Sequence, residues 1–211
     1  MTLPTSGLIT INDRGARAAT TFGSVEAGGG NMVFIKKLTA SSSGDLTFHD
    51  GTSSVVFDST YKEYLFTFKD IHPATDNVFL GHQADVDGQT TYGQTCTNTM
   101  FYARHYENDS LANVSVYSSD DQAQGTAVNK MVQLGNDNDQ AGAGYLHIFN
   151  PSSTTFVKHF ISRFNGAHPS DTTFEIYNAG YYNTTSALNT FRFKMTSGNI
   201  DAGDICLYGI N

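Results

Sequence analysis

Apolar and polar residues alternate along many short segments of this chain. The clearest example is the stretch 64–68, where Tyr64, Phe66 and Phe68 occupy every second position. Successive side chains of a strand point to opposite faces, so these three aromatics should share one buried face. The stretch ends at Ile71-His72-Pro73, because proline cannot extend a ladder of backbone hydrogen bonds. The pattern predicts a central β-strand.

The same alternation predicts strands throughout the chain beyond residue 31, and helix at only a few per cent. The segment 127–135 fits either a strand or a short helix, and Asp50-Gly51 predicts a hairpin turn between 46–49 and 54–57. The other predicted strands are 32–38, 78–84, 99–104, 112–117, 145–149, 155–163, 173–177, 191–195 and 204–208. So many short strands predict an all-β fold over 31–211, an antiparallel β-sandwich that is jelly-roll-like.

Residues 1–30 differ from the rest and predict an extended N-terminal arm. A triple glycine at 28–30 is typical of a flexible joint. The arm cannot form its own core, so it is either disordered or ordered by packing on a partner. In the second case, we expect docking through apolar residues and through arginines that pair with carboxylates. The candidate docking residues are Leu3, Leu8, Ile9, Ile11, Arg14, Arg17 and Phe22.

Composition narrows the classes of partner. The chain has 211 residues, a size that fits one sandwich domain, and a formal net charge of −8. This negative net charge argues against binding to nucleic acid and against binding to an anionic membrane surface. No apolar run reaches the length of a transmembrane helix, and we expect no secretory signal.

Candidate metal and redox sites are weak. Asp85-Val-Asp-Gly88 resembles the start of a calcium loop, but no acid follows to complete it, so a hairpin turn is favoured. Asp137 and Asp139 fit a solvated turn. Cys96 and Cys206 lack metal or redox spacing and are interpreted as two separate buried thiols, with a disulfide as the alternative. The histidines form no ligand pair: His49, His72, His82, His105, His147, His159 and His168. His72 and His168 precede prolines and are predicted in turns. No cofactor or metal is expected.

Catalytic motifs are lacking in the sequence, and binding to sugars remains an open alternative. Neither a Gly-x-Ser-x-Gly motif nor an activated cysteine is present, so we expect no enzyme. Tyrosines on exposed faces can stack on sugar rings, although most should serve the core or a subunit interface. The candidates are Tyr102, Tyr106, Tyr117, Tyr177, Tyr181 and Tyr182. The sequence assigns no particular residue to glycan binding.

Three segments, 50–77, 149–160 and 197–210, resemble a virion structural protein of tailed phages of marine bacteria, cyanophages among them. The arm segments 3–13 and 22–23 are similar to an N-terminal motif of phage fibre and appendage proteins, although 14–21 is longer and more basic than in that motif. The resemblance implies an arm that docks on the particle and a projecting sandwich, on head or tail, without a catalytic site.

Two functions follow as expectations. The first is a fibre, spike or head-decoration protein of the virion. We expect it to form a homo-oligomer, with a trimer as the first expectation. Its expected partners are other capsid or tail proteins and host-surface glycans. The second is a carbohydrate-binding, lectin-like sandwich.

Overall fold

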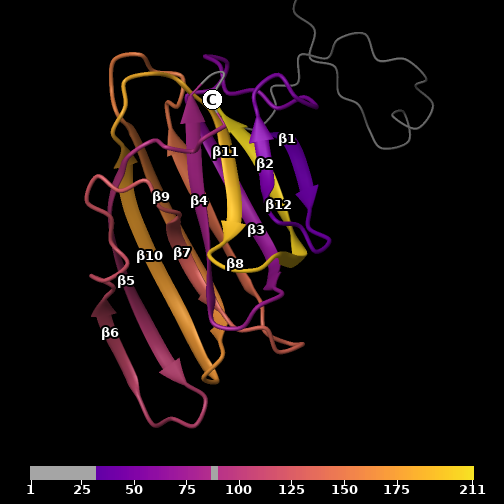
Figure 1. Cartoon of the computed structure of the whole chain (residues 1–211), viewed down its shortest axis with the longest axis vertical. Coiled ribbons are helices and arrows are strands. Elements are labelled where there is room, and N and C mark those ends of the chain that lie inside the picture. Colours follow the sequence, from indigo (N-terminus) through magenta and orange to yellow (C-terminus); the bar gives the residue numbers. More distant parts are fainter. Residues whose placement is uncertain (1–31, 87–89) are drawn as a thin grey trace, which may run out of the picture. The chain divides into compact units, whose positions relative to one another are not determined.

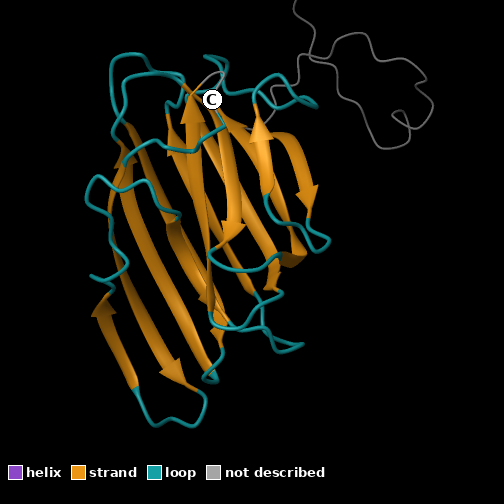
Figure 2. Ribbon diagram, viewed as in Figure 1, coloured by secondary structure: helices purple, strands orange, loops and turns teal. Residues whose placement is uncertain are grey.

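All the regular secondary structure of the described residues is β-strand. The structure is a computed structural model and describes residues 32–86 and 90–211, in which no helix occurs (Figure 2). Its strands are β1 (Met32–Thr39), β2 (Leu46–His49), β3 (Glu63–Pro73), β4 (Val78–Val86), β5 (Cys96–Tyr106), β6 (Ala112–Val116), β7 (Asn129–Leu134), β8 (Gly142–Phe149), β9 (Lys158–His168), β10 (Thr172–Tyr182), β11 (Leu188–Met195) and β12 (Ile200–Ile210). The predicted all-β class is confirmed.

Two antiparallel sheets pack face to face. The larger has eight strands in the order β1-β12-β3-β8-β9-β10-β5-β6, and the smaller has four in the order β2-β11-β4-β7. In Figure 1 the strands of the smaller sheet lie in front of the larger one. If β5, β6, β9 and β10 are set aside, four strands remain in each sheet, in the orders β1-β12-β3-β8 and β2-β11-β4-β7. Nearly every connection between consecutive strands of this set then crosses from one sheet to the other. This is the jelly-roll topology.

The core lies between the sheets, and the predicted central strand β3 supplies much of it. Tyr64, Phe66 and Phe68 are buried as expected. The ring of Phe66 lies 4.9 Å from that of Phe193 on β11 and 5.3 Å from that of Phe48 on β2. Aromatic contacts of this kind therefore join the two sheets.

The four remaining strands widen the larger sheet beyond β8. β9 and β10 form a hairpin whose register is set by the short turn 169–171, with Thr172 opposite His168. In that turn the Ser170 N–H donates to Nδ1 of His168 and the Thr172 hydroxyl donates to the Ser170 carbonyl. β5 and β6 form the second addition, next to β10. The widened sheet carries the candidate site described below.

Several local predictions need correction. The segment 54–57 is not a strand: Ser53 and Ser54 have positive φ angles of 50° and 71°, which breaks an extended conformation. Val55 and Phe57 are nevertheless buried, so the segment inserts apolar side chains into the core from a turn. The ambiguous segment 127–135 contains a strand, β7. Histidines 72 and 168 lie in the last residues of β3 and β9 rather than in turns.

The cysteines are both free, as interpreted from the sequence. Cys96 on β5 is buried, whereas Cys206 on β12 is only half-buried, which the sequence did not predict. Their strands are five places apart in the larger sheet. At about 4.8 Å between neighbouring strands, this is far beyond the separation that a disulfide bridges.

Candidate binding face of the larger sheet

The larger sheet has one surface that the smaller sheet does not cover, here called the outer face. Residues directly opposite one another form a row across five strands of this face: Val116 on β6, Phe101 on β5, Tyr177 on β10, Arg163 on β9 and Tyr145 on β8. Alternation in each strand places these side chains away from the core. Polar, aromatic and aliphatic groups thus meet on one broad surface.

The outer face carries several exposed apolar side chains among its polar ones. Most of the exposed large apolar side chains of the described residues lie on it: Met32, Phe34, Phe101, Val114, Val116, Tyr145 and Ile161. Val114 keeps 71% of its surface exposed and Phe34 keeps 56%. Exposed apolar side chains gathered on one face commonly mark a contact with another molecule.

A fixed cluster of side chains occupies the middle of this face. The ring of Tyr177 stacks on Phe101, with centroids 4.9 Å apart and planes within 5°. The Arg163 guanidinium lies 5.2 Å from the Tyr177 ring centroid, at cation–π distance. Nε of Arg163 also donates a hydrogen bond to Oε1 of Glu175, and this bond raises the pKa of Arg163 above its ordinary value. The guanidinium is therefore held in one position.

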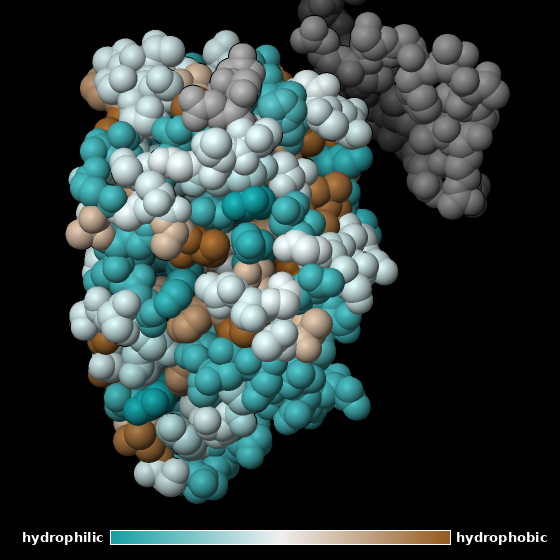
Figure 3. All heavy atoms as spheres, viewed as in Figure 1, coloured by the Kyte–Doolittle hydropathy of each residue, from teal (hydrophilic) through white to brown (hydrophobic). Residues whose placement is uncertain are grey.

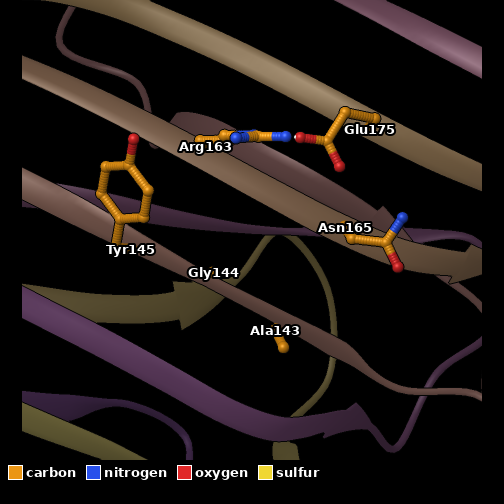
Figure 4. A pocket seen from close by; sticks show the side chains of 6 residues that line it. All are labelled: Ala143, Gly144, Tyr145, Arg163, Asn165 and Glu175. Atoms are coloured by element: carbon orange, nitrogen blue, oxygen red, sulfur yellow. Dashed lines mark hydrogen bonds and ion pairs between the residues drawn. The ribbon is translucent and has the colours of Figure 1, made fainter.

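Beside this cluster the outer face is hollowed. The hollow has a volume of about 300 Å³ and is lined by Ala143, Gly144, Tyr145, Arg163, Asn165 and Glu175 (Figure 4). Tyr145 forms one side, the Arg163–Glu175 pair a second and Asn165 a third, while Ala143 is too small to fill the space. Nδ2 of Asn165 donates to the Thr173 hydroxyl (2.9 Å) and to the Phe174 carbonyl (3.1 Å). The amide is thereby oriented.

Gly144 allows the strands beneath the hollow to pack closely. A Cβ at this position would lie 2.3 Å from the backbone oxygen of Arg163 and 2.6 Å from the ring of Phe164. Both distances are shorter than real Cβ contacts, so a side chain here would force β8 and β9 to shift. The glycine therefore permits the observed packing of β8 on β9, in which Tyr145 lies opposite Arg163.

The outward surface of the smaller sheet differs, because several of its polar side chains already contact other side chains of the same chain. Arg192 donates to Gln83 (2.6 Å) and its guanidinium lies 3.6 Å from the centroid of the Tyr92 ring. The Tyr117 hydroxyl donates to Gln133 (3.0 Å). Figure 3 looks onto this side and shows a mostly hydrophilic surface. The larger sheet therefore offers the better candidate site.

The candidate metal ligands do not assemble. Within the described ranges, no three of the His, Cys, Asp and Glu side chains could hold a metal ion together. The buried carboxylate of Asp85 instead accepts hydrogen bonds from the backbone N–H groups of Val86 (3.0 Å) and Tyr92 (2.8 Å), which links the end of β4 to Tyr92. Asp87 lies outside the described residues. Asp137 lies in a turn that the Gln140 N–H closes on the Asp137 carbonyl (2.8 Å).

The predicted tyrosines divide between the two surfaces. Tyr102 and Tyr117 pack with Phe174 on the core side, and Tyr182 is buried with its hydroxyl 2.8 Å from Nδ1 of His82. Tyr177 and Tyr181 lie on the outer face, and Tyr106 is half-buried at the end of β5, beside the guanidinium of Arg104. Both faces of the Tyr177 ring are occupied, by Phe101 and by Arg163.

The residues around the hollow were missed by sequence reasoning. Tyr145, Arg163, Asn165 and Glu175 all sit in strand segments, out of phase with the buried positions. Their strands are consecutive in the chain and adjacent in the sheet. These residues could have been found by pairing the predicted strands 145–149, 155–163 and 173–177 as successive hairpins. Alternation within each strand then places their outward side chains on one face.

Comparison with known proteins gives no family. The chain matches no protein-family model, no curated protein and no solved structure. Among the described residues there is no helix long and apolar enough to cross a membrane. The arm residues Leu3, Leu8, Ile9, Ile11, Arg14, Arg17 and Phe22 lie outside the described part of the chain.

Proposed function

We propose that this protein is a non-enzymatic structural component of a tailed-phage virion, a fibre, spike or head-decoration protein that docks through residues 1–30 and displays the sandwich. The observation that carries the proposal is the uncovered, apolar outer face of the larger sheet. Jelly rolls are common in viral shells and in lectins, both of which function through exposed surfaces rather than through catalytic clefts.

The segments that carry the sequence resemblance support this setting. Residues 50–77 include β3, residues 149–160 join β8 to β9, and residues 197–210 include β12. These strands are neighbours in the larger sheet, in the order β12-β3-β8-β9. The resemblance is therefore concentrated in one continuous part of the fold.

Assembly with further copies is supported by the edge strand β6. The Tyr106 N–H donates to the Leu111 carbonyl (3.0 Å), and the Tyr117 N–H donates to the Met100 carbonyl (2.9 Å). Because bonding residues alternate in an antiparallel ladder, the odd-numbered residues 111–117 bond toward β5. The backbone N–H and C=O groups of Ala112, Val114 and Val116 therefore point away from the sheet.

This edge lacks the usual protection against pairing. The segment 112–116 contains no charged residue and no proline, and its side chains at 114 and 116 are exposed valines. Such an edge readily accepts a strand from another chain. We propose that a neighbouring copy pairs here in a homo-oligomer, for which a trimer remains our expectation.

The test begins with purified particles and mass spectrometry, which should detect this chain as a stoichiometric component. A variant that lacks residues 2–27 should fold with an unchanged thermal midpoint but fail to join particles. Normal incorporation of the truncated chain would remove the docking role of the arm. Absence of the chain from purified particles would overturn the proposal as a whole.

A carbohydrate-binding module is the second candidate function, and the hollow beside Tyr145 specifically favours it. An open hollow with an aromatic wall and oriented polar groups suits a sugar. The two candidates are compatible if the displayed sandwich adheres to the host surface. The protein composition of purified particles distinguishes the two candidates, because it tests the virion role and does not test sugar binding.

A further inference from the structure

We infer that the hollow on the outer face is a binding subsite for a neutral saccharide, with Tyr145 as the stacking ring and Arg163, Asn165 and Glu175 as the hydrogen-bonding groups. The inference rests on the adhesive role in the proposed function and assigns that role to particular residues. Its starting point is the open hollow of about 300 Å³ that these side chains line on β8, β9 and β10 (Figure 4).

Tyr145 supplies an aromatic surface that the fold does not use. Its side chain is 37% exposed at the wall of the hollow, and no other ring of the described residues packs on it. Tyr177, by contrast, has both faces occupied. A partly exposed tyrosine ring offers apolar contact to the C–H face of a pyranose while its hydroxyl stays in water.

The polar groups around the hollow retain unused hydrogen-bonding capacity. Arg163 uses Nε toward Glu175, which leaves its terminal NH₂ groups as donors. The second carboxylate oxygen of Glu175 and Oδ1 of Asn165 remain acceptors, because Asn165 uses only its nitrogen toward Thr173 and Phe174. A sugar hydroxyl both donates and accepts, so neighbouring hydroxyls match this arrangement of donors and acceptors.

These groups are positioned before any ligand arrives. The Arg163 guanidinium is held between Glu175 and the Tyr177 ring, and the Asn165 amide is held by two hydrogen bonds. Binding therefore immobilises little additional side-chain freedom. The site is nevertheless shallow, so each site should bind weakly, and several copies on one particle would raise the overall affinity.

Charge selects a neutral ligand. Glu175 neutralises Arg163 within the hollow, and the chain as a whole carries −8. A sialylated or sulfated glycan would meet no uncompensated positive charge at this site. The chemistry therefore fits a neutral hexose or a neutral oligosaccharide.

The experiment is saturation-transfer NMR on the full chain. The probes are methyl glycosides of glucose, galactose, mannose and N-acetylglucosamine, with lactose and maltose as neutral disaccharides and sialyllactose and a heparin tetrasaccharide as acidic ones. We expect saturation transfer to at least one neutral probe and less to its acidic counterparts. No transfer to any neutral probe, or stronger transfer to the acidic ones, overturns the inference.

Matched variants locate the site. Tyr145→Ala should lower the affinity for the neutral probe about tenfold, the effect of losing one aromatic contact of about 1.4 kcal/mol. Glu175→Gln should also weaken binding, because the freed Arg163 can rearrange and a carboxylate acceptor is lost. Ile161→Ala is the control: it removes an exposed apolar side chain of the same face that does not line the hollow. Equal losses for Tyr145→Ala and Ile161→Ala contradict the assignment.

An experiment that refutes the saccharide subsite can be distinguished from one that refutes the proposed virion role. If the chain is a component of purified particles but transfers no saturation to neutral sugars, only the saccharide subsite is refuted. Each variant is first checked for an unchanged thermal midpoint, so a lost signal reports the site rather than the fold.

Discussion

The two surfaces of the eight-stranded sheet are built from alternate residues of the same strands, yet among the described residues only one of them is covered by a second sheet. On β9, Phe160 and Phe164 are buried beneath the smaller sheet, while Ile161 and Arg163 between them face outward. The covered surface is dense with aromatic contacts between the sheets. The outer face carries apolar groups that contribute little to the core. Stability and recognition can therefore change independently in this fold.

The largest expected difference between the surfaces is in stability. Phe66→Ala should lower the free energy of unfolding by about 3–5 kcal/mol, because it opens a cavity among fully buried rings. Phe101→Ala on the outer face should cost only about 1 kcal/mol, mainly through its stacking with Tyr177. Urea unfolding measures both, with m-values that should match the wild type. Similar costs for the two substitutions would show that the outer face belongs to the core.

A pH effect of intermediate size should come from the covered surface. His82 is fully buried beside Tyr182 and Phe160, and burial lowers its pKa from 6.5 to about 3. Below pH 6.5 the unfolded chain binds the proton and the folded chain does not, so stability should fall as the pH falls toward 3. Between pH 7.5 and 4.5 this should cost about 2–3 kcal/mol.

The His82→Gln variant isolates this effect. It should be less stable than the wild type at neutral pH but should lose about 2–3 kcal/mol less on acidification, since the other groups titrate alike in both chains. Urea titrations at the two pH values give the difference. An identical acid dependence in the variant would show that His82 is not the group responsible.

The smallest effect on stability should accompany the clearest effect on assembly. Val114→Lys at the exposed edge strand should change the free energy of unfolding by no more than about 0.5 kcal/mol. The added charge should nevertheless block strand pairing and shift the oligomer toward a 22.9 kDa monomer in light scattering. Thr52→Lys, in an exposed loop, is the control with the same charge change. An oligomer unaffected by Val114→Lys would move the interface away from β6.

Alternation in the sequence was enough to predict the fold class and most strands. It succeeded best where both the buried and the outward residues are distinctive, as in 64–68. Alternation did not predict the end of β9 or the beginning of β12. These parts contain Asn165-Gly166 and Ala202-Gly203, and glycine and asparagine are poor strand formers in isolation. It failed at 54–57, where burial is supplied by a turn.

The candidate site was less accessible to sequence reasoning for a physical reason. Tyr145, Arg163 and Glu175 form no motif, and their proximity depends on the registers of two hairpins. Those registers are fixed by turn geometry around 150–157 and 169–171, to which alternation is blind. The sequence also could not show that Tyr177 is occupied on both faces while Tyr145 is not.

The central claim, that the outer face of the larger sheet is the surface through which this protein meets other molecules, is tested most directly by hydroxyl-radical footprinting. Oxidation rates would be compared between the free chain and the chain in purified particles. Phe101, Val114 and Tyr145 should be protected in the particle, while Phe156, an exposed side chain in the connection from β8 to β9, keeps its rate. Unchanged rates across the outer face, with protection confined to the loops over the smaller sheet, would contradict the account.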